Sequence, residues 1–145
     1  MERLSRKIEI LMVEDNPGDV RLFREALETC EVKHELSVAG DGEIAMALLR
    51  REGAYSETVR PDLVILDWNL PKKCGKEVLQ EIKSDESLAS IPVVVFTTSR
   101  APQDIRDTYD GRGNCFITKP AHFRQFVEAV ESIKEFWLTV ALLPR

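Results

Sequence analysis

Five polar side chains stand directly after short apolar runs, at widely separated positions in the chain. They are the carboxylates of Glu14, Asp15 and Asp67, the hydroxyl of Thr97 and the ammonium of Lys119. If these carboxylates came together, their mutual repulsion would raise their pKa values. A divalent cation removes that repulsion, and oxygen ligands suit Mg²⁺. Such a site favours a phosphoryl group as its anion, held by Lys119 and Thr97, with one carboxylate as the nucleophile.

The apolar runs have the lengths and β-branched content of strands. They cover residues 8–13, 35–39, 62–67, 91–96 and 114–118. A segment of helical periodicity follows each run, and this alternation predicts a doubly wound α/β domain. We expect a five-stranded parallel sheet with helices on both faces. Because ligands bind beyond the carboxyl ends of parallel strands, the polar side chains are expected to converge.

The last helix is expected to pack one apolar face against this sheet. That face comprises Phe123, Phe126, Val127, Val130, Ile133 and Trp137. Apolar residues continue in the segment 138–145, at Leu138, Val140, Leu142 and Leu143. A domain of this size has limited core to absorb them, and exposed apolar surface usually marks an interface. We therefore expect a homodimer formed by the last helix, this tail and the strand at 114–118; alternatively, the tail folds back onto its own domain.

The composition narrows the class of protein. A chain of 145 residues has the length of one domain, so we expect no separate DNA-binding output domain. Twenty Lys and Arg against 25 Asp and Glu give a net charge of −5, which disfavours nucleic acid as a partner. No apolar run is long enough to cross a bilayer or to form a signal peptide. Three cysteines without a CxxC motif indicate reduced thiols, so we expect a cytoplasmic protein with no membrane partner.

One motif suggests a dinucleotide-binding domain. Gly40, Gly42 and Ala45 match the pattern G-x-G-x-x-A between a predicted strand and a predicted helix. However, Asp41 and Glu43 would place negative charge where the pyrophosphate must bind. We therefore reject this function.

A phosphatase of the haloacid-dehalogenase type also uses a nucleophilic aspartate with Mg²⁺. That chemistry needs a second aspartate two residues after the nucleophile, as the acid and base, and position 69 is Asn. Turnover on external phosphoesters is therefore disfavoured, and this class is the alternative function.

The ordered motifs resemble the receiver domain of bacterial two-component response regulators. They are Glu14-Asp15, Asp67 at the end of Leu63–Asp67, Leu70-Pro71 with Gly75, Val93–Thr97, and Lys119-Pro120. The resemblance covers residues from about Ile8 to Trp137 and implies the strand order 2-1-3-4-5. Residues 1–145 would then form a single receiver domain, with an apolar extension at 138–145. The segments 67–73 and 136–138 resemble, more narrowly, single-domain regulators that partner bacterial and cyanobacterial phytochromes.

The resemblance implies a phosphoacceptor and a metal site. Asp67 would accept a phosphoryl group from a phosphohistidine of a sensor histidine kinase. Asp15 and Asp67 would bind Mg²⁺ through their carboxylates, Asn69 through its main-chain carbonyl, and Glu14 through a water molecule. Mn²⁺ or Ca²⁺ could replace Mg²⁺.

The resemblance also implies a switch. Thr97 and Lys119 would bind phosphoryl oxygens, and the Lys119-Pro120 peptide would be cis, a geometry that proline makes accessible. Phosphorylation would bias Thr97 and Phe116 together and alter the face formed by the last two helices and the last strand. Such a protein catalyses only its own phosphorylation and dephosphorylation, so it is not an enzyme in the ordinary sense.

Several residues depart from the family pattern. Glu14 stands where Asp is more common, and its longer side chain should still reach a metal-bound water. Phe116 lacks the hydroxyl of a tyrosine, so it would act by packing alone. Thr98 stands where a smaller residue is common, and its bulk is expected to hinder the attacking water and prolong the phosphorylated state. Trp68 either packs over the mouth of the site or is a partly exposed loop aromatic.

Overall fold

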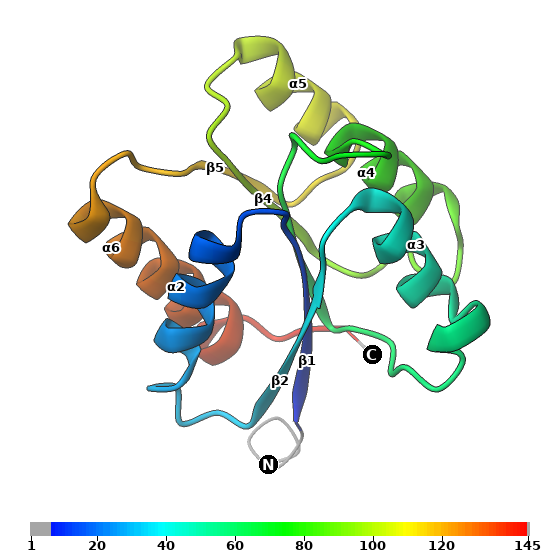
Figure 1. Cartoon of the computed structure of the whole chain (residues 1–145), viewed down its shortest axis with the longest axis horizontal. Helices are drawn as coiled ribbons and strands as arrows, with labels where there is room; N and C mark the ends of the chain where they lie inside the picture. Colours follow the sequence, from blue (N-terminus) through cyan, green and yellow to red (C-terminus); the bar gives the residue numbers. More distant parts are fainter. Residues whose placement is uncertain (1–6, 145) are drawn as a thin grey trace.

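The strands form one parallel sheet, shown in Figure 1, a computed structural model that describes residues 7–144. They are β1 (Ile8–Val13), β2 (His34–Ala39), β3 (Leu63–Leu66), β4 (Val93–Thr97) and β5 (Cys115–Thr118). Their order across the sheet is β2-β1-β3-β4-β5, and every neighbouring pair is parallel. The predicted fold and strand order are therefore confirmed. The expected absence of a signal peptide concerns residues 1–6, which lie outside the described part.

Helices cover both faces of this sheet (Figure 1). On one face lie α2 (Pro17–Leu27) and α6 (Phe123–Lys134); on the other lie α3 (Gly42–Arg50), α4 (Gly75–Ser84) and α5 (Pro102–Asp110). A 3₁₀ turn, η1 (Gly53–Tyr55), lies between α3 and β3, and a π-helical segment, η2 (Glu135–Val140), continues α6. The two helical layers explain why the central strands are predominantly apolar.

The strand β1 shows how each face acquires its core. Ile10 and Met12 pack with the α2 and α6 layer, whereas Leu11 and Val13 pack with the α3 and α4 layer. The same alternation continues in β3 and β4. Because both faces are covered, the later part of the strand is apolar on both sides, and its one polar residue, Glu9, lies near the beginning. The first polar residues after these strands are therefore at the carboxyl edge of the sheet.

The helix α2 begins immediately after β1. The side chain of Asn16 accepts hydrogen bonds from the N–H groups of Gly18 and Asp19, and Pro17 occupies the first turn. This cap turns the chain sharply and leaves the residues between β1 and α2 at the edge of the sheet.

Two aromatic side chains lie elsewhere than their expected places. Trp68 is buried in the core beneath α3 and α4, so neither expectation for it is correct. The cause is strand periodicity, which places Trp68 on the same face as Leu66 and Val64. Phe123, expected in the core, is 69% exposed because it is the first residue of α6, and packing of α6 begins at Phe126.

The tail at 138–145 was expected either to form a dimer interface or to fold back onto its own domain, and its described residues do not all behave alike. Leu138 is buried, and Leu143 is half-buried against the core of the α2 and α6 layer, so part of the tail folds back. Val140 and Leu142 remain 58% and 78% exposed. Among the described residues, no helix is both long and apolar enough to span a membrane.

Candidate functional site

Three carboxylates meet at the carboxyl edge of the sheet. Glu14 and Asp15 follow β1, Asp67 follows β3, and one oxygen from each lies within 4.8 Å of the others. The main chain fixes this arrangement, because the N–H of Asp67 donates to the carbonyl of Val13 at 3.0 Å. Glu14 and Asp67 are buried, whereas Asp15 is exposed and opens the cluster to solvent.

A buried ammonium joins this carboxylate cluster. Lys119, after β5, places its Nζ 2.5 Å from Oε1 of Glu14, 2.8 Å from Oδ2 of Asp19 and 3.5 Å from Oδ2 of Asp67. Its Nζ also lies 5.8 Å from the centre of the Phe96 ring. Sequence reasoning missed Asp19 as a partner of Lys119. The sequence feature that could have indicated this contact is the position of Asp19 in the first turn of α2, four residues after Asp15.

The Lys119-Pro120 peptide is trans, since the described residues contain no cis peptide bond, and the expected cis geometry is wrong for this structure. The main-chain N–H of Lys119 donates to the carbonyl of Thr97 at 2.6 Å. This bond continues the pairing of β5 with β4 by one residue. The strand itself therefore directs the ammonium into the site, and a trans peptide suffices.

The charges in the site alter the proton affinities of its members. Burial raises the pKa of Glu14 to about 7; the hydrogen bond from Lys119 opposes this rise and the negative charge of Asp67 adds to it. Burial alone would lower the pKa of Lys119, but hydrogen bonds with Asp19 and Glu14 and the charge of Asp67 raise it. The ammonium thus keeps its proton, and a further cation would relieve the repulsion that Glu14 experiences.

The other expected site residues lie around this cluster. Thr97 is fully buried at the end of β4, and its hydroxyl accepts a hydrogen bond from the N–H of Ser99 at 3.4 Å. Asn69 is exposed, and its N–H lies 3.4 Å from Oδ1 of Asp67. Phe116 is half-buried against the α3 and α4 layer, and its N–H donates to the hydroxyl of Tyr109 at 3.1 Å. The bond to Tyr109 ties the exposed edge of β5 to α5.

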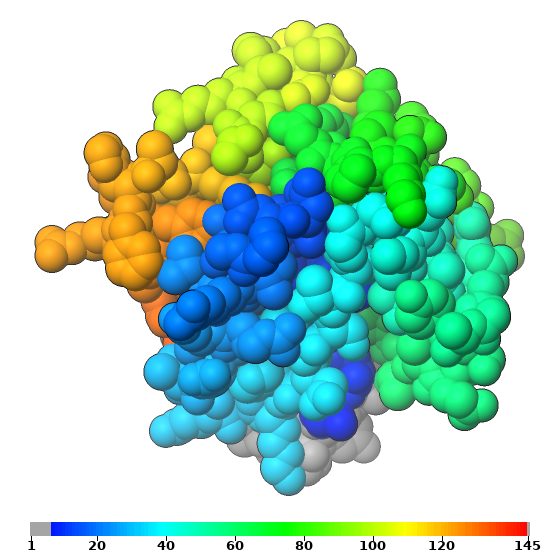
Figure 2. All heavy atoms as spheres, in the orientation of Figure 1, coloured from blue at the N-terminus to red at the C-terminus, as the bar shows by residue number. Residues whose placement is uncertain are grey.

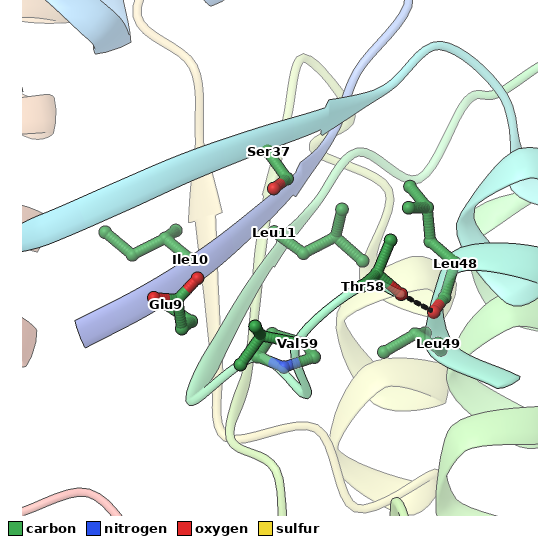
Figure 3. A pocket seen from close by; sticks show the side chains of 9 residues that line it. Glu9, Ile10, Leu11, Ser37, Leu48, Leu49, Thr58 and Val59 are labelled. Carbon is green, nitrogen blue, oxygen red and sulfur yellow. Dashed lines mark hydrogen bonds between the residues drawn. The ribbon is translucent and has the colours of Figure 1, made fainter. Parts of the chain in front are cut away.

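A separate pocket lies away from these residues (Figure 3). It is formed by β1, β2, α3 and the segment before β3, with Leu11, Leu48 and Leu49 in its wall. The hydroxyl of Thr58 donates to the carbonyl of Leu48 at 3.1 Å across its edge. None of the site residues described above lines this pocket.

The chemistry of the donor set fits a hard divalent cation. Carboxylate oxygens from separate loops face one another, and the exposed Asp15 leaves room for water ligands. The neighbouring ammonium of Lys119 supplies a second positive charge. Together these groups can hold a tetrahedral, doubly charged anion against a carboxylate nucleophile.

Comparisons with known proteins agree with this chemistry. A model of the response regulator receiver domain family matches residues 10–131. Response regulator Rcp1 from Synechocystis sp. is 45% identical over 93% of this chain and 92% of its own length. The solved structure of the Mn²⁺-bound form of Rcp1 matches with a TM-score of 0.94 at 44% identity, covering 95% of this chain and 99% of that chain. The phosphorylated cyanobacterial phytochrome response regulator RcpA matches with a TM-score of 0.94 at 51% identity, covering 97% and 100%.

Proposed function

Because this chain belongs to the response regulator receiver family, we propose that Asp67 accepts a phosphoryl group from a phosphohistidine of a sensor histidine kinase. The observation that carries this proposal is the carboxylate cluster within 4.8 Å, with Nζ of Lys119 3.5 Å from Asp67. Similarity to the phosphorylated regulator RcpA supports it. The domain of residues 1–145, with a core at about 8–137 and an extension at 138–145, would then act as a stand-alone regulator in the cytoplasm.

The metal in this proposal is Mg²⁺, which Mn²⁺ or Ca²⁺ could replace. Asp15 and Asp67 would bind it directly, Asn69 through its main-chain carbonyl, and Glu14 through a water molecule. When bound, the cation neutralises charge on the phosphoryl oxygens. Receiver domains bind divalent metals, and the Mn²⁺-bound form of Rcp1 supports a metal in this chain.

In the transfer step, a carboxylate oxygen of Asp67 attacks phosphorus as the phosphorus–nitrogen bond of the phosphohistidine breaks. The bonding electron pair leaves with the imidazole, and an acyl phosphate forms on Asp67. Lys119 would turn its ammonium from Glu14 and Asp19 towards a phosphoryl oxygen. The hydroxyl of Thr97 would leave the N–H of Ser99 and bind another.

Thr97 and Phe116 would carry this change to the protein surface. Movement of Thr97 leaves space at the end of β4, next to β5. Phe116 would fill that space by packing, because it has no hydroxyl, and α5 would adjust through Tyr109. The output is then a change in protein contacts, and the only catalysis is phosphorylation and dephosphorylation of the protein itself.

Labelling of the full chain tests the phosphoacceptor. With acetyl phosphate and Mg²⁺, we expect one stable phosphoryl group on the wild type, none on Asp67→Asn, and normal labelling of Asp110→Asn, a control at an exposed carboxylate. Label that survives in Asp67→Asn contradicts the proposal. Release of phosphate over many turnovers, without labelled protein, identifies the phosphatase alternative.

The kinase partner is proposed to be a phytochrome. RcpA, 51% identical to this chain, is a cyanobacterial phytochrome response regulator, and this similarity supports the assignment. Phosphotransfer from a panel of purified histidine kinases tests it. We expect transfer from a phytochrome kinase to be the fastest; faster transfer from an unrelated kinase rejects this partner.

We also propose a homodimer through α6, β5 and the tail. Phe136, Val140 and Leu142 are 51%, 58% and 78% exposed and leave apolar surface at the end of α6. Light scattering should show a dimer for the wild type and a monomer for Leu142→Lys. A wild-type monomer at micromolar concentration, with and without phosphorylation, contradicts the dimer.

A further inference from the structure

The turn before α3 touches the loop that carries the proposed phosphoacceptor. This turn belongs to the G-x-G-x-x-A segment at 40–45, which the charges of Asp41 and Glu43 exclude from dinucleotide binding. The β3–α4 loop, residues 67–75, runs from Asp67 to the start of α4. In Figure 2 the cyan surface at the start of α3 lies against the green surface of this loop.

The base of the β3–α4 loop is closed upon itself. The N–H of Gly75 donates to the carbonyl of Trp68 at 2.9 Å. A Cβ on Gly75 would lie 2.5 Å from the carbonyl oxygen of Asp67 and 2.6 Å from Cα of Trp68. The two ends of the loop are therefore held together, and its tip, residues 71–73, is connected to Asp67 and Asn69 by only a few residues of main chain.

The loop tip rests on Gly42. A Cβ at this position would lie 2.0 Å from the carbonyl oxygen of Lys73 and 2.7 Å from its Cβ. Gly42 is the first residue of α3 and does not have a positive φ, so its backbone conformation does not require glycine. What requires glycine is the close approach of the Lys73 main chain.

Asp41 joins the start of α3 to the same tip. Its Oδ1 accepts the N–H of Ile44 at 2.8 Å and caps α3, while its Oδ2 lies 3.6 Å from Nζ of Lys72. The carboxylate is buried, and Lys72 has a φ of 65°, in the left-handed region. One side chain thus caps the helix and also pairs with the residue at which the loop turns.

A second ion-pair chain holds the other side of the tip. Lys73 pairs with Glu81 in α4, and Glu81 pairs with Arg50 at the end of α3 at 3.0 Å. The hydrogen bonds from Lys73 and Arg50 outweigh the effect of burial and lower the pKa of Glu81. Lys73 is therefore tied to α3 and α4, while Pro71 and Lys72 of the tip are exposed.

We propose that Asp41 and Gly42 are positioning residues for the phosphoacceptor loop. Their contacts with Lys72 and Lys73 set where Asp67 and the carbonyl of Asn69 lie relative to Glu14 and Asp15. They thereby set the affinity of the site for Mg²⁺. This inference rests on the proposed function and extends it to residues that touch neither metal nor phosphate.

A pair of glycine substitutions tests the proposal in the full chain. Gly42→Ala adds a methyl group against Lys73, whereas Gly40→Ala is the matched control, because a Cβ there meets nothing within 4 Å. Alanine is well tolerated in helices, so a defect in Gly42→Ala arises from the loop contact. We expect the dissociation constant for Mg²⁺, measured by calorimetry, to rise about tenfold in Gly42→Ala and to stay unchanged in Gly40→Ala. Equal affinities in both variants overturn the proposal.

Metal-free fluorescence in a Trp137→Phe background gives a second readout, because Trp68 is then the only tryptophan of the chain and adjoins Asp67 in this loop. Its emission should shift in Gly42→Ala and not in Gly40→Ala. Absence of a shift also counts against the proposal. These measurements do not depend on phosphorylation. If Asp67 of the wild type accepts no phosphoryl group, the proposed function fails while the positioning of the metal site is still measured.

Substitution of Asp41 decides the matter if Gly42→Ala does not fold. Asp41→Ala removes both the cap and the ion pair, whereas Asp41→Asn retains an oxygen for the cap. A role in capping alone predicts that Asp41→Asn restores wild-type Mg²⁺ affinity, and that result overturns the proposal. A positioning role predicts that Asp41→Asn still binds Mg²⁺ about twofold to fivefold more weakly.

Discussion

Two lysines of this protein are buried to nearly the same degree in opposite surroundings. Lys119, 6% exposed, faces carboxylates at the carboxyl edge of the sheet. Lys83, 9% exposed, lies in the last turn of α4 and donates to the main-chain carbonyls of Ala89 and Ile91, each at 2.9 Å. The first ammonium has anionic side-chain partners, whereas the second has neutral main-chain ones.

Their proton affinities move in opposite directions as a result. Burial lowers the pKa of Lys83, and the positive charge of Arg112 adds to that effect. Burial acts on Lys119 in the same sense, but its bonds with Asp19 and Glu14 raise its pKa. Burial alone therefore does not distinguish a lysine suited to binding an anion. The carboxylates at the strand ends make that difference. They keep the ammonium of Lys119 protonated, and this ammonium can then bind an anionic ligand.

Removal of each ammonium should separate the two roles most clearly. Lys119→Met is expected to lower the rate of Asp67 labelling by about 100-fold, because a charged donor to the phosphoryl oxygens is lost. The rate is measured with acetyl phosphate at saturating Mg²⁺. Lys83→Met is the matched control and should label at the wild-type rate. Similar losses in both variants would show that the rate follows general stability instead.

Lys83 should contribute to stability rather than to phosphorylation. Lys83→Met leaves the carbonyls of Ala89 and Ile91 without their donor and is expected to lower the free energy of unfolding by about 1–3 kcal/mol. Urea unfolding measures the change. Lys76→Met, at an exposed pair with Asp107, is the control and should change stability by less than about 0.5 kcal/mol. An unchanged Lys83→Met would mean that water replaces the ammonium without cost.

Of the two lysines, the sequence predicts the surroundings of Lys119, because they depend on where strands end. Glu14, Asp67 and Lys119 each follow a predicted strand of one parallel sheet, so the sequence places them together at its carboxyl edge. The predicted bounds of β1, residues 8–13, agree with the structure because its apolar run ends at Glu14. Side-chain partners across the fold are another matter. In the sequence, Asp19 is recognisable only as an acidic residue in the first turn of a helix, although its carboxylate accepts a hydrogen bond from Lys119 in the folded protein.

The burial of individual side chains near the ends of strands and helices is harder to predict, because the sequence pattern does not show where packing begins and ends. Trp68 continues the alternation of β3 beyond the last paired residue and is buried. Phe123 fits the helical period of α6 but precedes its packed part. Lys83 fits the helix pattern of α4 as a polar surface residue, and nothing in the sequence indicated that carbonyls of residues 89 and 91 would enclose it. These outcomes are set by tertiary packing.

At alkaline pH, the two lysines should change the free energy of unfolding in opposite directions. For Lys83, the folded state loses its proton first, so between its lowered pKa and the ordinary value of 10.5 the free energy of unfolding should rise with pH. For Lys119, the stabilising contribution is present below 10.5 and is lost as pH rises through the raised pKa. Urea unfolding without metal, comparing wild type with Lys83→Met and with Lys119→Met, measures each contribution. If the contributions of Lys83 and Lys119 to the free energy of unfolding changed with pH in the same direction, the inference that their surroundings shift their pKa values oppositely would be wrong.

The smallest effect concerns a residue at the site that is not buried at all. Thr98 follows Thr97 and is exposed, so it holds no ammonium and no carboxylate in place. We expect it to act through its bulk, which would obstruct the water that attacks the phosphoryl group on Asp67. Thr98→Ala should therefore lose phosphate about threefold faster, a barrier change below 1 kcal/mol, in a single-turnover measurement of dephosphorylation. Thr98→Val keeps the bulk and removes the hydroxyl, so its rate should match the wild type. If Thr98→Val loses phosphate as fast as Thr98→Ala, the hydroxyl rather than the volume controls the lifetime, and polar contacts at this edge extend beyond the buried cluster.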